Sequence, residues 1–158
     1  MKKLVISCLI PLSLGLLVSF FLNTKLYEQL IKPEFSPPRI IFPIAWSIIY
    51  ILLGISNYLT SKNKEANIIY YISLAINLIW PIIFFNYKEY LIALIWIILL
   101  LIFVIIMTIK YFKINKLSGL LQIPYILWIL YATYLNYNIF ILNWWNSVQI
   151  FIFKWYNN

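Results

Sequence analysis

The sequence predicts an all-α integral membrane protein built as a five-transmembrane-helix bundle. Of its 158 residues, 65% are hydrophobic and 10% are charged, and a soluble fold could not bury that much apolar surface. The sixteen charged residues all lie outside five uncharged windows: 4–24, 40–61, 66–87, 90–109 and 117–153. About 20 apolar helical residues cross roughly 30 Å of hydrocarbon, so each window is long enough to span a bilayer.

These windows place the helices at about residues 4–23, 40–60, 67–87, 90–110 and 118–142. The first helix follows Met-Lys-Lys as a signal peptide would, but no small-residue cleavage site follows it, so we expect it to be retained. In the fifth window, a turn near Asn136 would leave too few residues for another crossing. We therefore expect a membrane domain over 1–143 and a Trp-rich interfacial tail over 144–158.

Only the first connection, residues 24–39, is long. Its second half holds Pro33, Pro37 and Pro38, and three prolines in six residues exclude a regular helix and favour a stiff, extended segment. A plain linker is one interpretation. The aromatic Phe35 and the mixed charges of the segment favour a structured lid instead.

The distribution of lysine and arginine predicts the orientation. Seven of these residues lie at the N-terminus and in the second and fourth loops, and five lie on the opposite side. This excess favours a cytoplasmic N-terminus, and a bacterial cell membrane is the expected location. The net charge of +8 lies in short loops, where it would meet lipid headgroups, so it implies no nucleic-acid partner.

Three predicted helices carry aromatic, small and amide residues along one face. The stripes are Trp46, Tyr50, Gly54 and Asn57 in the second helix, Asn77, Trp80 and Phe84 in the third, and Trp128, Ala132, Leu135 and Asn136 in the fifth. The fourth helix is almost uniformly aliphatic and is expected to be a lipid-facing scaffold.

The amides indicate what the stripes could do. An unpaired amide in hydrocarbon costs on the order of 2 to 7 kcal/mol, so Asn77 should face inward. It could bond neighbouring helices or orient a ligand, and Trp46 could belong to an interfacial aromatic belt. The flat rings of Trp80 and Trp128 on the same faces favour a pocket for a planar apolar ligand.

The residue types that are missing exclude several functions. The sequence has no His and no Asp, and its four Glu residues lie in loops or at helix ends. A His-dependent catalytic triad cannot be built, and one Cys with two Met disfavours a transition-metal or haem-iron site. No ionisable residue lies inside a predicted span, which argues against an ion-coupled transporter.

Several separated motifs occur in a fixed order along the chain. They are Gly15, Leu-x-Lys-Pro-x-Phe-x-Pro-Pro from Leu30 to Pro38, Phe42, Trp46, Tyr50, Gly54, Asn77-x-x-Trp80 with Phe84-Phe85, Pro124-Tyr125-x-x-Trp128, and Ala132-x-x-Leu135-Asn136. From about Gly15 to Asn143 the chain thereby resembles the TspO/MBR family. These are the tryptophan-rich sensory proteins, whose mitochondrial members are called translocator protein or peripheral benzodiazepine receptor.

The resemblance implies a homodimer of five-helix bundles with a pocket that binds porphyrins and, in many members, synthetic benzodiazepine-site compounds, with no obligatory cofactor. By motif position, the pocket would be lined by Trp46, Tyr50, Asn77, Trp80, Trp128, Ala132 and Leu135 and roofed by Pro33, Phe35, Pro37 and Pro38. Lys32 and Arg39 could meet ligand carboxylates at the pocket mouth.

The chain also departs from the family pattern. It has Leu26 and Phe35 where many relatives have loop tryptophans associated with tetrapyrrole handling, and its third helix lacks a Gly-rich packing motif used for dimerisation in some relatives. The leading hypothesis is a membrane receptor or sensor that binds a planar hydrophobic ligand, a porphyrin or a benzodiazepine-site compound. A transporter of porphyrin-like or lipophilic molecules is the alternative, and porphyrin degradation ranks third.

Overall fold

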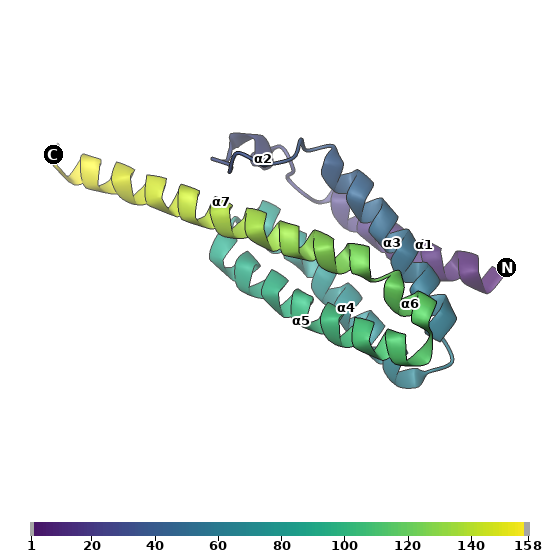
Figure 1. Cartoon of the computed structure of the whole chain (residues 1–158). Helices are drawn as coiled ribbons and strands as arrows, with labels where there is room; N and C mark the ends of the chain where they lie inside the picture. Colours follow the sequence, from purple (N-terminus) through teal and green to yellow (C-terminus); the bar gives the residue numbers. More distant parts are fainter. Residues whose placement is uncertain (1, 157–158) are drawn as a thin grey trace.

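The structure is a computed structural model that describes the backbone of residues 2–156 and the side chains of residues 2–144. These described residues form helices and connecting turns, with no strand among them (Figure 1). Five of the helices are long and apolar enough to cross a membrane. The predicted all-α, five-transmembrane-helix class is therefore confirmed.

The first four predicted spans agree with observed helices to within four residues at each end. The observed helices are α1 (Lys2–Phe20), α3 (Ile41–Thr60), α4 (Lys64–Pro81) continued by the π-helix η1 (Ile82–Tyr87), and α5 (Tyr90–Ile114). A short helix that the sequence did not predict, α2 (Leu26–Gln29), lies in the first loop. We call the end of the bundle that carries this loop the lid end.

The fifth span differs from its predicted range, 118–142. It begins as a short helix, α6 (Lys116–Leu120), turns at residues 121–122, and continues as α7 (Ile123–Tyr156), which extends beyond the other helices (Figure 1). Pro124 is tolerated because it lies in the first turn of α7, where backbone N–H groups have no partner within the helix. Residue 143 is thus not a helix end. Of the predicted tail, only the Trp144 side chain is described, and an interfacial position stays a prediction.

Helices α1 and α3 make a close backbone contact at Gly54. A methyl group placed on Gly54 would lie 2.5 Å from the Cα atom of Cys8 and 2.6 Å from the carbonyl oxygen of Ser7. The Ser7 hydroxyl also donates a 2.9 Å hydrogen bond to the Gly54 carbonyl oxygen. Small residues allow membrane helices to approach in this way. Only Ser7 and Pro11 of α1 are buried, so this crossing is its main attachment.

Helix α5 is more than a lipid-facing scaffold. One face packs against α4, α6 and α7, and its buried residues include Ala93, Ile97, Leu100 and Val104, none of which is measurably exposed. The other face exposes isoleucine and leucine along its whole length, as a lipid-facing helix should. The predicted role as a lipid-facing scaffold therefore fits the exposed face of α5 but not its buried face.

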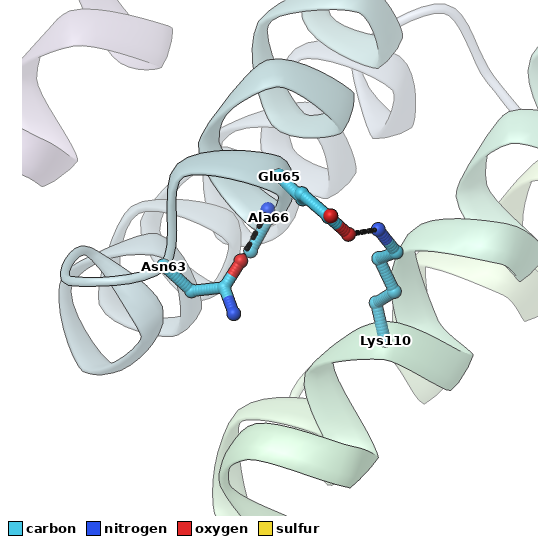
Figure 2. Close-up of polar contacts among 4 residues, drawn as sticks. All are labelled: Asn63, Glu65, Ala66 and Lys110. Atoms are coloured by element: carbon cyan, nitrogen blue, oxygen red, sulfur yellow. Dashed lines mark hydrogen bonds and ion pairs between the residues drawn. The ribbon is translucent and has the colours of Figure 1, made fainter.

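Polar contacts fix the start of α4 against the end of α5 (Figure 2). The Asn63 side chain accepts a 3.0 Å hydrogen bond from the backbone N–H of Ala66 and so caps α4. Lys110 of α5 donates to the carboxylate of Glu65, which lies in the first turn of α4. An acidic residue in that turn also complements the helix dipole. These contacts hold the end of the bundle opposite the lid.

We expect Gly54→Ala to destabilise the protein, because the added methyl group meets backbone atoms that cannot rotate away. Overpacking of this kind costs about 1–3 kcal/mol. Thermal unfolding in detergent micelles should show a lower midpoint for Gly54→Ala and an unchanged one for the control Ser47→Ala, which lies on an exposed part of the same helix. Equal midpoints for the two variants would contradict the close α1–α3 contact.

Candidate ligand-binding site

Asn77 lies at the centre of the bundle, where it joins three helices. It is 2% exposed, and its side-chain oxygen accepts a 2.7 Å hydrogen bond from the Tyr50 hydroxyl of α3. Its amide nitrogen donates a 2.9 Å hydrogen bond to the Tyr125 hydroxyl of α7. Asn77 therefore faces inward and links neighbouring helices, which was one of its two expected roles.

A second buried amide lies nearer the lid end. Asn136 of α7 accepts a 3.1 Å hydrogen bond from the indole N–H of Trp80 and donates a 2.9 Å hydrogen bond to the backbone carbonyl of Tyr90. These bonds connect α7 to α4 and α5. The hydrogen bond from its indole N–H fixes the edge of the Trp80 ring, so the two flat faces of the ring can pack against other side chains.

Aromatic rings fill the space between these amides and the first loop. The ring-centroid separations are 5.7 Å for Trp46–Tyr50, 6.3 Å for Trp46–Trp128, 6.0 Å for Trp128–Phe42 and 5.1 Å for Phe42–Tyr27. The first pair is stacked and the other three are edge-to-face, both of which are favourable arrangements. The rings form one continuous apolar surface that leads from Asn77 to the loop.

A π-helical turn places two more aromatic residues at the site. Pro81 has no N–H to donate to the preceding turn, and the chain continues as the wider helix η1. The consecutive residues Phe84 and Phe85 are both buried, at 3% and 8% exposure. Lys88 then adopts a left-handed backbone conformation, with φ at 60°, and ends the turn.

The space enclosed by these side chains is small. A cavity of about 10 Å³, enough for one water molecule, is lined by Trp80, Ala132 and Leu135 of the predicted set together with Tyr27 and Phe42 at the lid end. Pockets for drug-sized ligands measure roughly 300–1,000 Å³. A planar ligand could enter only if the rings and the loop moved apart.

The first loop is folded onto itself above this cavity. Leu26 and Tyr27 of α2 are buried, at 7% and 2% exposure. The Tyr27 hydroxyl donates a 3.3 Å hydrogen bond to the carbonyl oxygen of Pro37, and burial raises the pKa of this phenol above its ordinary value. Lys32 lies 4.7 Å from the centre of the Tyr27 ring.

Side chains of α7 and η1 fasten the loop to the bundle. The Tyr131 hydroxyl donates a 2.7 Å hydrogen bond to the carbonyl oxygen of Phe35. The Asn143 amide accepts from the backbone N–H of Ile31 and donates to its carbonyl, at 3.2 and 3.0 Å. Asn86 binds the start of the loop in the same two-way manner, through Asn23 and Phe21. These bonds favour the structured lid over the plain linker.

Not all predicted site residues meet in the cavity. Four of the predicted lining residues lie outside it, in the adjoining network of rings and amides: Trp46, Tyr50, Asn77 and Trp128. Phe35 does not roof it, because its side chain is 73% exposed while its carbonyl is held by Tyr131. Pro38 is also exposed, whereas Pro33 and Pro37 are half-buried. Arg39 lies 3.6 Å from the carboxylate of Glu28, with both side chains exposed, and its role at a pocket mouth stays a prediction.

Other residues of the site were absent from the predicted set. Tyr125 stands three residues before Trp128 on the same helical stripe, so its spacing could have revealed it. In the sequence, Phe42 was noted only as part of the family motifs, and Phe84 only as part of these motifs and of the stripe on the third helix. Tyr27 gave no sequence signal, because its place depends on how the loop folds.

Comparison with known proteins places these residues in a family context. The model of the TspO/MBR family matches residues 7–142, which is most of the chain.

Individual relatives match over shorter segments. A tryptophan-rich protein TspO of Archaeoglobus fulgidus is 36% identical over 59% of this chain and 66% of its own length. A tryptophan-rich sensory protein of Cereibacter sphaeroides is 34% identical over 43% of this chain and 45% of its own length. A translocator protein homolog of Schizosaccharomyces pombe is 27% identical over 54% of this chain and 58% of its own length. The matched segments thus span about half to two thirds of these relatives.

We expect Asn77→Ala to lower the stability of the protein in detergent. The substitution leaves the hydroxyls of Tyr50 and Tyr125 without this partner, and a buried polar group left unpaired costs about 1–3 kcal/mol. The matched control is Asn138→Ala, because the Asn138 amide donates to a carbonyl of its own helix. Thermal unfolding should show a lower midpoint for Asn77→Ala than for the control, and the reverse order would refute the central role of Asn77.

We expect Tyr131→Phe to loosen the lid, because it removes the hydroxyl that holds the Phe35 carbonyl and keeps the ring. Hydrogen–deuterium exchange of residues 30–39 should become faster, while exchange in α3 and α4 should not change. Tyr134→Phe serves as the control, since Tyr134 is an exposed tyrosine one turn further along α7. Identical exchange of the loop in the two variants would show that this bond does not hold the lid.

Proposed function

Because the chain belongs to the TspO/MBR family, we propose that this integral membrane protein is a receptor or sensor that binds a planar hydrophobic ligand beneath the first loop. The ligand class is a porphyrin or a benzodiazepine-site compound. A sensory protein and a translocator protein homolog are among the named relatives.

The observation that carries this proposal is the row of aromatic rings that leads from Asn77 to Phe42 and Tyr27 at the cavity. Flat rings stacked or set edge-to-face from Trp46 to Tyr27 suit a planar apolar ligand, and the buried amide of Asn77 lies at their inner end. The indole N–H of Trp128 is buried and has no hydrogen-bond partner among the described residues. It would donate to an acceptor on the ligand, such as a carbonyl or carboxylate oxygen.

The closed geometry favours a receptor over a transporter. A transporter must open to both sides of the membrane, whereas the cavity lies at the lid end and the bundle beyond Asn77 is filled by buried side chains such as Leu53 and Leu74. Sealed vesicles containing the protein should therefore bind protoporphyrin without accumulating it in the lumen. Protein-dependent accumulation would favour the transporter.

Catalysis is the weakest of the three functions. The sequence has no His and no Asp, and the cavity is lined by neutral side chains. Such a site supplies stacking and hydrogen bonds but no imidazole or carboxylate to act as general acid or base in porphyrin breakdown.

We expect Ala132→Leu to block ligand binding, because Ala132 lines the cavity and a leucine would fill the space that the ligand needs. Overpacking penalties of about 1–3 kcal/mol correspond to an affinity loss of roughly fivefold to 150-fold. Protoporphyrin titration, followed by tryptophan quenching in detergent, measures the effect.

The matched control for this titration is Ala75→Leu, which makes the same change at an exposed position of α4. It should bind protoporphyrin like the wild type. Equal affinities for Ala132→Leu and the wild type would place the ligand elsewhere, and no binding by the wild type would refute porphyrin as the ligand.

A further inference from the structure

Three buried polar side chains on the far side of Asn77 from the lid have no hydrogen-bond partner among the described residues. Gln122 is 0% exposed, and neither the oxygen nor the nitrogen of its amide is paired. The hydroxyls of Tyr70 and Ser73 are also unpaired, and both residues are 1% exposed. Four polar atoms in one part of the bundle thus lack partners.

The register of two helices places these side chains at one level. The third and fifth spans run in the same direction, and the bond from Asn77 to Tyr125 aligns them. Ser73 lies about one turn before Asn77, and Gln122 lies about one turn before Tyr125. Both residues are therefore one turn nearer the end of the bundle opposite the lid. Tyr70, one turn further along the same face of α4, lies within electrostatic range of Tyr125.

Leaving these groups unpaired would be costly. Each buried unpaired polar group costs about 1–3 kcal/mol, and the surrounding hydrocarbon offers no solvent to satisfy it. Polar groups buried in native proteins are almost always paired, with protein atoms or with ordered water. A buried water molecule typically makes about three hydrogen bonds, which matches the number of side chains present.

We propose that Gln122, Tyr70 and Ser73 form an internal hydration site, in which ordered water bridges the amide of Gln122, in the turn before α7, to the two hydroxyls of α4. Water suits the site because it donates to the Gln122 oxygen and accepts from the amide N–H or a hydroxyl. A chloride ion would leave that oxygen unpaired. Its charge would also be buried among neutral side chains, at a high desolvation cost.

The hydration site would complete a polar path along the bundle axis. Toward the lid lies the bonded set of Tyr50, Asn77 and Tyr125. Toward the opposite end, Tyr111 donates to Asn57 at 3.4 Å. Ordered water between them would connect the floor of the ligand site to the far end of the membrane domain. This inference stands without the proposed ligand.

X-ray hydroxyl-radical labelling in H₂¹⁸O, applied to the wild-type protein in detergent, tests the site. Radicals form from bound water and oxidise the side chains beside it, so Tyr70 should acquire ¹⁸O although it is buried. Fragmentation of the peptide by mass spectrometry separates Tyr70 from its exposed neighbour Tyr71. Absence of label on Tyr70 would overturn the proposal.

Variants show whether the label arises from this water. Gln122→Leu replaces the amide by an apolar side chain of similar size and should reduce labelling of Tyr70 several-fold, while the control Asn138→Leu, in α7, should leave it unchanged. Should Gln122→Leu fail to fold, Ser73→Val removes another of the three polar groups and carries the same expectation. Labelling of Tyr70 that persists at the wild-type level in the folded variant would overturn the proposal.

Discussion

The two hydrogen bonds of Asn77 hold α3, α4 and α7 together at the centre of the bundle, and the cavity lies between this point and the first loop. In hydrocarbon an amide must find its partners within the protein, so its position fixes the rotation of three helices at once. With that rotation set, the stripes that carry Trp46, Trp80 and Trp128 face a common interior. Nearer the lid, Asn136 of α7 joins three helices in the same way, because its side chain bonds to the indole of Trp80 in α4 and to the backbone of α5.

The sequence alone predicted the spans well, because hydrocarbon excludes charge and the windows between charges are therefore the membrane segments. It also predicted that Asn77 faces inward. It could not predict α2 or the break at residues 121–122, since both depend on how short segments pack against the bundle. The partners of each amide, and the outward position of Phe35, likewise depend on three-dimensional register rather than on spacing.

The closed cavity has an energetic consequence for ligand binding. A site of about 10 Å³ must expand before a planar molecule can enter, and the bonds of Tyr131 and Asn143 to the lid must break or stretch. Each such bond contributes about 0.5–1.5 kcal/mol. The apparent affinity is then reduced by the fraction of protein that is open. Under the proposed function, ligand binding and lid position would therefore be two measures of the same equilibrium.

Helix α7 connects every part of this arrangement. The same inward face carries Tyr125 beside Asn77, Ala132 at the cavity and Asn136 at Trp80, and the helix reaches the lid through Tyr131 and Asn143. A ligand that separates the lid from the aromatic rings acts on α7 at several of these points. Because Gln122 directly precedes α7, a rotation or shift of this helix would also move the amide of the proposed hydration site. A single helix thus runs from the lid to the turn that carries Gln122, and labelling of Tyr70 would report any movement of α7 that reaches this turn.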